Sequence, residues 1–338
     1  MRALICGYYG YGNGGDEALL QALLQFLPPT WEPLVISGNP QATQTLHGIP
    51  AVGRGRVGGV LWRERGVFVF GGGSLIQDST SWRSPLFYLG LMGLAQQRGW
   101  QTIAWAQGLG PLRRRWIAEL TRRCLQGCQA ISVRDQESSR LLKNWGIPHH
   151  LAPDPVWALE PGPVPPISAA PAIAVILRPH PHLSRRRLER LTQALEILQQ
   201  QTASHLLLLP MQWPQDLPLA QYLHQQLPAS HLIQLRDPRL IAGTLAQVHL
   251  TISMRYHGLV MAARGGSRCF GLSYDPKVRL LLDSLDLPGW NLEDLPEDPQ
   301  AMAQSWLESF QGSPLPAVVR QQWQQQAETH RQILEQIG

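Results

Sequence analysis

Short apolar runs alternate along the chain with stretches in which apolar residues recur at helical spacing. In the first half the runs predict strands at 3–6, 34–37, 67–70, 102–106 and 130–133. Between them the spacing predicts helices at 16–27, 85–98, 115–128 and 135–145. Strands that alternate with helices in this way favour parallel sheets built from strand–helix–strand units.

The alternation is interrupted once and then resumes. Prolines crowd the segment 161–171, which can hold neither a helix nor a central strand and is predicted to be a linker. Strands are then predicted at 173–177, 206–209, 232–235, 250–253 and 269–272, with a helix carrying Leu188, Leu191, Leu195 and Leu198 on one face. The tail, 318–337, is predicted to be a packed helix.

These elements predict an α/β protein of two doubly wound domains that face each other across a cleft. A length of 338 residues suits two domains. We expect an N-terminal domain at 1–160, the linker at 161–171 and a C-terminal domain at 172–312. We expect the segment 313–338 to form a helix that crosses back to the first domain.

Charge and composition limit the classes of partner that the chain is expected to bind. The chain has 29 basic and 24 acidic residues, a net charge of +5, and its only lysines are Lys143 and Lys277. This balance is compatible with acidic small molecules, nucleic acid or anionic membrane surfaces, and the arginine runs 113–115 and 185–187 fit solvated helix starts. No apolar run is long enough to span a membrane. The apolar stretch at the N-terminus is too short for a signal peptide, so we expect a cytoplasmic location.

The strand ends carry the candidate chemistry, because parallel sheets bind ligands beyond the carboxyl ends of their strands. The first strand is followed by a segment in which Gly10, Gly12 and Gly15 match a dinucleotide-binding spacing. The second strand lacks the acid that an NAD site needs, and an equally good interpretation is a glycine-rich turn with Asp16 as the helix N-cap. Two further glycine-rich strand ends follow at 71–74 and 107–111.

Cationic side chains follow several other strands. Arg134 follows the fifth strand, where it can either clamp an anion or pair with Asp135 or another nearby carboxylate. In the second half Arg178 follows the first strand, and Arg255 and His257 stand where a strand gives way to a helix. Lys277 follows the next strand. A lysine at a helix start is mildly unfavourable against the helix dipole, so a bound anion would give it a purpose.

Several motifs together resemble the bacterial polysaccharide pyruvyl transferases, most closely those of cell-wall or S-layer polysaccharide assembly. The resemblance spans nearly the whole chain and rests on motifs at 7–18, 107–111, 132–138, 154–156, 254–257 and 274–277. It implies a GT-B-like fold of two Rossmann-like domains. It also implies transfer of a pyruvyl group from phosphoenolpyruvate to a sugar, with formation of a cyclic ketal and release of phosphate.

The resemblance implies roles for individual residues. His257 is expected to be the catalytic acid or base, and Arg134 and Lys277 to hold the phosphate and carboxylate of the donor. Arg178, Arg255, Gly12, Asn13 and Asp16 are expected to complete the substrate site. Asp16, Glu17 and Asp154 stay open as the acid that protonates the methylene carbon. No metal or cofactor is expected beyond the donor substrate.

The partners expected are phosphoenolpyruvate and a saccharide acceptor, which in this family can be carried on a lipid and would bring the enzyme to the inner membrane face. The alternative is a GT-B glycosyltransferase that uses a nucleotide sugar. A third interpretation, a basic protein that binds nucleic acid or an anionic membrane without catalysis, finds no nucleic-acid motif in the sequence, and we expect no nucleic-acid partner.

Overall fold

The computed structural model describes residues 1–79, 81–167, 171–227 and 229–337, and the chain divides into two compact units. The first comprises Met1–Tyr11, Asp16–Leu159 and Trp323–Gly338, and the second Gly12–Gly15 and Glu160–Gln322. The predicted linker begins within the second unit, where the Gly162 amide donates a hydrogen bond to the Arg239 carbonyl (2.8 Å). Its residues 168–170 lie outside the described part of the chain.

The first unit is built on a parallel sheet whose strands have the order β3-β2-β1-β4-β6-β7-β8, with β5 paired to β6. The strands are β1 (Arg2–Tyr9), β2 (Glu32–Ser37), β3 (Ala51–Gly53), β4 (Gly66–Phe70), β5 (Gly73–Ile76), β6 (Gln101–Leu109), β7 (Ala130–Val133) and β8 (His150–Leu151). The helices are α1 (Gly14–Phe26), α2 (Pro40–His47), α3 (Val57–Arg63), α4 (Arg83–Gln97), α5 (Arg115–Gln126), α6 (Gln136–Asn144) and, from the end of the chain, α14 (Thr329–Glu335).

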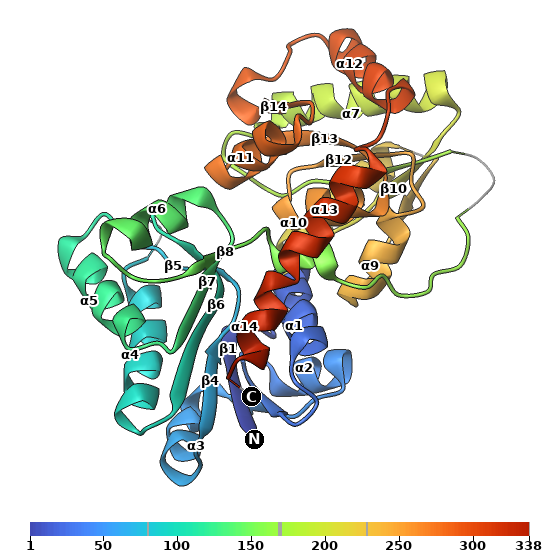
Figure 1. The fold of residues 1–338 in the computed structure, drawn as a ribbon. Coiled ribbons are helices and arrows are strands. Elements are labelled where there is room, and N and C mark those ends of the chain that lie inside the picture. Colours follow the sequence, from blue (N-terminus) through green and yellow to red (C-terminus); the bar gives the residue numbers. More distant parts are fainter. Residues whose placement is uncertain (80, 168–170, 228, 338) are drawn as a thin grey trace. The chain divides into compact units, whose positions relative to one another are not determined.

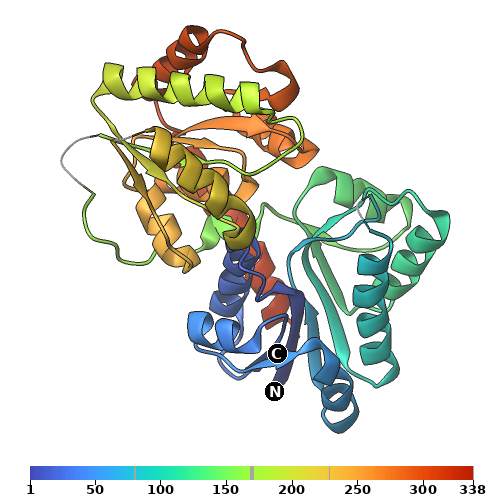
Figure 2. The ribbon, with the colours of Figure 1, turned by 180° about the vertical axis from the view of Figure 1, so that it is seen from behind.

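Two apolar clusters cover the two faces of this sheet. One packs residues of α3, α4, α5 and α6 against side chains such as Phe68 and Phe70. The other packs α1 and α14 against side chains such as Val67 and Trp105, and both views show α14 beside α1 (Figure 1, Figure 2). Strands buried on both faces explain why their sequences are continuous apolar runs rather than alternating ones.

The second unit repeats the plan with the strand order β11-β10-β9-β12-β13-β14. Its strands are β9 (Ala172–Ile176), β10 (His205–Leu208), β11 (Ser230–Leu232), β12 (Leu250–Ser253), β13 (Arg268–Ser273) and β14 (Gly289–Asn291). Its helices are α7 (Arg185–Thr202), α8 (Trp213–Gln226), α9 (Pro238–Leu245), α10 (Tyr256–Gly265), α11 (Pro276–Leu285) and α12 (Pro299–Gln311), followed by α13 (Ala317–Ala327). Numbered within the unit, the order is 3-2-1-4-5-6, the Rossmann order.

Two predicted elements are wrong in their extent. The strand expected at 232–235 is β11, which ends at Leu232, because the edge of the sheet offers pairing only as far as Leu208. The glycine-rich strand ends at 71–74 and 107–111 supply further strand residues, since Gly73 pairs with Gln107 between β5 and β6. The single tail helix is divided at Glu328 into α13 and α14.

His330 joins α14 to the centre of the first sheet. It is fully buried, and its ring nitrogens contact the Ser132 hydroxyl (2.9 Å) and the Pro153 carbonyl (2.8 Å). Its own carbonyl accepts a hydrogen bond from the Trp105 indole (3.0 Å). Because a carbonyl only accepts, the nitrogen facing Pro153 carries the proton, and the ring is satisfied in its neutral form.

Acid is therefore expected to destabilise the first unit through this histidine. Burial lowers the pKa of His330 from 6.5 to about 4. Because this pKa is lower in the folded protein than in the unfolded chain, the unfolded chain takes up the proton first. The contribution of the neutral histidine to the free energy of unfolding is therefore fully present above pH 6.5, and it decreases by up to about 3 kcal/mol as the pH falls toward 4. His330→Gln should flatten the dependence of melting temperature on pH in that window, measured by calorimetry. An unchanged slope would exclude His330 as its source.

Candidate functional site

Five predicted site residues meet at the carboxyl edge of the second sheet. Strand β12 lies between β9 and β13, so the residues that follow these three strands share one edge. Arg178 follows β9, Arg255 and His257 follow β12, and Lys277 follows β13, while Asn13 is bridged to Gln212, which follows β10. The point between β9 and β12 is where the strand order reverses, and open parallel sheets bind their ligands at such points.

His257 stands in the first turn of α10 and is packed against the chain segment Gly12–Gly15. The Gly14 amide donates to the Met211 carbonyl (2.6 Å), and the Trp213 amide donates to the Gly12 carbonyl (2.9 Å). A Cβ atom on Gly15 would lie 2.3 Å from His257 Nδ1. The glycines of the opening motif therefore let backbone approach the imidazole, which Tyr256 flanks edge-on at 5.1 Å between ring centres.

We expect Gly15→Ala to impair the site without unfolding the protein. The new methyl group overlaps the His257 ring, which must rotate or move, and displacing a catalytic group by about 1 Å can cost on the order of 100-fold in rate. The matched control is Gly93→Ala in α4, where an added Cβ meets nothing within 4 Å. Turnover should fall in the first variant only, at similar melting temperatures. Equal turnover in both would show that the close approach does not position His257.

The start of α1 differs from the prediction. The helix begins at Gly14, two residues before Asp16, so Asp16 lies in the first turn and is not the N-cap. The Asn13 side chain takes the capping role instead, because its Oδ1 accepts from the Gly15 amide (3.1 Å). Gly12 has a positive φ of 69°, which favours glycine there. We expected Gly12, Asn13 and Asp16 to contact the substrates, and the structure shows that Gly12 and Asn13 also shape the start of α1.

Arg255 is held by a partner that the sequence analysis did not single out. Asp216, fully buried in the first turn of α8, accepts from Arg255 Nε (3.0 Å) and from its Nη2. Its Oδ2 also accepts from the Gln212 amide (2.9 Å). Arg255 is only 8% exposed. We expected it to contact the substrate directly, whereas the geometry favours a residue that positions the β12–α10 junction. The signal available in the sequence was an aspartate in the first turn of a helix that follows a strand.

Arg178 lies over an aromatic side chain at the same edge. Its Nη1 donates to the Tyr274 hydroxyl (3.0 Å), and its guanidinium carbon is 4.8 Å from the centre of the Tyr274 ring. His180 packs on the other side of the cluster, 5.0 Å from the same ring. Burial, together with the nearby His182 and Arg178, lowers the pKa of His180. The cluster places a cation and a readily neutral imidazole beside the β9 end.

Lys277 lies in the first turn of α11 and is the more accessible cation. Its Nζ is 3.7 Å from Asp275 Oδ2, and its side chain is 42% exposed. Asp275 also caps the helix by accepting from the Lys277 amide (3.0 Å). A loose pair of this kind contributes little to stability, and the ammonium can turn toward an anion at the strand ends.

Arg134 occupies the corresponding edge of the first sheet. It pairs with the buried Asp154 through Nη1 (2.6 Å), and its Nη2 donates to Ser74 Oγ in β5 (3.0 Å). Asp135, the partner considered from the sequence, instead caps α6 by accepting from the Ser138 amide (2.7 Å). A Cβ on Gly108 would lie 2.7 Å from Ser74 Oγ. The glycine-rich strand ends thus make room for a fixed guanidinium.

Two of the three acids considered as proton donors are engaged elsewhere. Asp154 holds Arg134 and also accepts from the Val156 amide (3.0 Å). Glu17 is buried between the Gly10 amide (2.8 Å) and His47 Nε2 (2.8 Å). Both carboxylates have fixed hydrogen-bond partners within the first unit, and Asp16, Glu17 and Asp154 all stay candidates for the proton donor.

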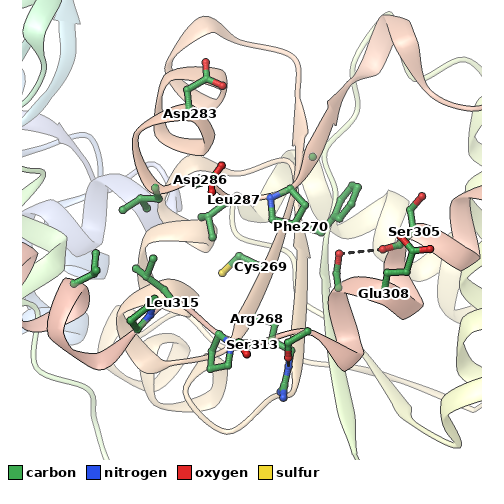
Figure 3. Close-up of a pocket in the computed structure, with 18 of the residues that line it drawn as sticks. Arg268, Cys269, Phe270, Asp283, Asp286, Leu287, Ser305, Glu308, Ser313 and Leu315 are labelled. Atoms are coloured by element: carbon green, nitrogen blue, oxygen red, sulfur yellow. Dashed lines mark hydrogen bonds between the residues drawn. The ribbon is translucent and has the colours of Figure 1, made fainter.

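A cavity of about 1010 Å³ in the second unit lies at a different place (Figure 3). Its lining includes Arg268 and Cys269 at the amino end of β13, and its other charged groups are Asp283, Asp286 and Glu308. Three carboxylates against one guanidinium suit an anionic donor poorly. None of the predicted site residues lines it.

Within the described residues, no group of three or more histidine, cysteine or acidic side chains could hold a metal ion. Among the helices of that same part of the chain, none is both long and apolar enough to cross a membrane.

Comparison with protein families decides the affiliation. The model of the polysaccharide pyruvyl transferase family matches residues 13–276. The chain belongs to this family. The matched region of this pyruvyl transferase family member contains Asn13, Arg134, Arg178, Arg255 and His257 and ends one residue before Lys277. The comparison with curated proteins gives no match.

Solved structures of two epimerases and a glycosyltransferase show the fold that this pyruvyl transferase family member has. UDP-GlcNAc 2-epimerase from Neisseria meningitidis, bound to UDP-GlcNAc, has a TM-score of 0.65 at 10% identity, covering 99% of both chains. The corresponding enzyme from Methanocaldococcus jannaschii scores 0.63 at 10% identity, covering 99% of this chain and 100% of that one. The spinosyn rhamnosyltransferase SpnG scores 0.59 at 12% identity, covering 100% and 97%. At these identities the likeness shows the GT-B-type fold of two Rossmann-like domains, as the sequence predicted.

Proposed function

We propose that this protein transfers the pyruvyl group of phosphoenolpyruvate to two hydroxyls of one sugar in a cell-wall or exopolysaccharide precursor. The observation that carries the proposal is the convergence of Arg178, His257 and Lys277 at the strand-order reversal of the second sheet, in a chain of the pyruvyl transferase family. Phosphoenolpyruvate carries a phosphate and a carboxylate a few ångströms apart. Such a dianion needs several fixed cations and helix N-termini.

The reaction requires two proton movements at the donor. One sugar hydroxyl adds to C2 of the enol as the methylene carbon gains a proton and becomes a methyl group. The second hydroxyl then displaces phosphate through an oxocarbenium-like state, and its proton leaves with the phosphate. The products are one cyclic ketal and one phosphate.

His257 suits the proton transfer at the attacking hydroxyl. It stands in the first turn of α10, beside Tyr256 and the Gly12–Gly15 backbone, and imidazole is the side chain most often used for such proton transfer. Arg178 and Lys277 supply charge for the donor, and the family resemblance of the 132–138 motif assigns Arg134 to the donor as well. Asp16, Glu17 and Asp154 stay the candidate acids for the methylene carbon.

The test is release of phosphate. The protein, incubated with phosphoenolpyruvate and an amino-sugar acceptor presented either on a lipid or as a nitrophenyl glycoside, should release phosphate only when the acceptor is present. Silence with every acceptor of the class would refute the proposal. The rival, a glycosyltransferase that uses a nucleotide sugar, predicts a thermal shift with uridine or guanosine diphosphate and none with phosphoenolpyruvate.

A further inference from the structure

An exposed aromatic and basic surface lies on the first unit, outside the site described above. Trp82 and Trp116 are 43% and 50% exposed, and their rings meet edge to face with centres 6.4 Å apart. Arg83 lies over the Trp82 ring at 5.6 Å. Exposed arginines at 113–115 precede Trp116. We name these residues, Trp82, Arg83, Arg113, Arg114, Arg115 and Trp116, the Trp–Arg surface.

The surface is built from two loops that are tied together. Trp82 and Arg83 follow β5 and begin α4, whereas the arginine run follows β6 and begins α5, and α4 and α5 pack side by side (Figure 1). Asp78 bridges the loops, because its carboxylate accepts from the Arg113 and Arg114 amides (2.7 and 2.8 Å). Although burial opposes ionisation, these hydrogen bonds keep the pKa of Asp78 below its usual value.

The Trp–Arg surface starts from the same edge of the first sheet that carries Arg134. Both loops leave the carboxyl edge of the first sheet, and β5 also contributes Ser74, the partner of Arg134. The charge is one-sided, since residues 78–123 contain seven arginines and two acids. One acid is the buried Asp78, and the other, Glu119, is paired with Arg122 and Arg123.

We propose that the Trp–Arg surface docks this protein on an anionic lipid bilayer. Tryptophan prefers the headgroup level of a membrane, where its ring is half buried and its N–H stays hydrated. Arginines beside it are attracted to anionic headgroups. An aromatic anchor plus a basic cluster gives the two signals that reversible membrane attachment requires.

The ring geometry favours lipid over nucleic acid. Single-stranded nucleic acid binds to aromatic faces on which successive bases stack. The Trp82 and Trp116 rings are inclined by 68°, so they present no parallel pair of faces. The docking proposal rests on the proposed function in one respect only: docking would bring the edge of the first sheet to an acceptor carried on a lipid.

The test is co-sedimentation of the full chain with vesicles. Binding is expected to vesicles of phosphatidylglycerol and phosphatidylcholine and not to phosphatidylcholine alone, and it should weaken as salt is raised. Arg113→Gln with Arg115→Gln should lower the partition coefficient roughly 25-fold, at about fivefold for each arginine. Trp82→Ala with Trp116→Ala should lower it by a similar or larger factor.

The matched control is Trp62→Ala. Trp62 is 60% exposed and also lies under an arginine, Arg98, but it belongs to α3 and is not part of the Trp–Arg surface. This variant should bind vesicles like the wild type, and all variants should share its melting temperature. Equal binding of all variants, or no vesicle binding by the wild type, would overturn the proposal. A third result would also overturn the proposal: the wild type binds a single-stranded oligonucleotide more tightly than vesicles, and the same variants lose that binding.

The outcome is separable from that of the proposed function. Vesicle binding needs no turnover, so it can succeed while phosphate release fails. Conversely, phosphate release with a water-soluble nitrophenyl acceptor in a protein that ignores anionic vesicles would refute only the docking proposal.

Discussion

His257→Ala is expected to lower the turnover number of phosphate release by about 10²–10⁴-fold, the usual contribution of a positioned acid or base. The affinity for phosphoenolpyruvate should change little, because the imidazole is assigned to the proton transfer and the cations to the donor. Turnover is measured with a phosphate assay at saturating acceptor. Donor affinity is measured by thermal shift or calorimetry.

Two further variants provide the comparison for His257→Ala. Lys277→Ala should show the opposite split, with weakened donor binding, since its half-exposed ammonium is assigned to the anion. His224→Ala removes a histidine of α8 whose Nδ1 contacts the Ser230 hydroxyl (2.9 Å), and this variant should retain full activity. Turnover within about fivefold of wild type in His257→Ala would remove the histidine from the chemistry.

Asp216→Asn is expected to destabilise the second unit by about 3–5 kcal/mol, because it leaves the buried Arg255 guanidinium without a compensating charge. For a unit of this size the melting temperature should fall by about 6–20 °C. Calorimetry of the full chain, with the two units as separate transitions if they resolve, measures the change.

A surface ion pair of the same unit provides the control. Asp283 pairs with Arg279 on α11, with both side chains about half exposed, and such pairs contribute about 0–1 kcal/mol. Asp283→Asn should therefore melt near the wild type. A melting temperature for Asp216→Asn as high as that of Asp283→Asn would show that the Arg255–Asp216 pair does not stabilise the β12–α10 junction.

The periodicity of the sequence was enough to predict the parallel α/β class and most central strands. Strand 250–253 is confirmed with its bounds, and the strand expected at 130–133 is also confirmed. Short edge strands such as β3 and β14 were missed, because three residues are too few to carry a periodic signal. The pairing of β5 with β6 was also missed, because the glycines at 71–73 hide the strand pattern.

The site was predictable where position in the fold decides it. Residues after adjacent parallel strands must share an edge, so Arg178, His257 and Lys277 could be assigned together. Pairings could not be predicted, because they depend on partners distant in sequence: Asp216 lies 39 residues from Arg255, and Asp154 lies 20 residues from Arg134. Neither spacing has a local signature.

The contact of His330 with Ser132 has a consequence for the order of folding during synthesis. The first unit contains Met1–Tyr11 and Asp16–Leu159 but is completed only by Trp323–Gly338. Domains usually fold in the order in which they leave the ribosome. Here the whole second unit is translated before α14 can cover Trp105 and Ser132. Until then the nascent first unit leaves exposed the part of its apolar face that Ile333 and Leu334 cover in the finished fold.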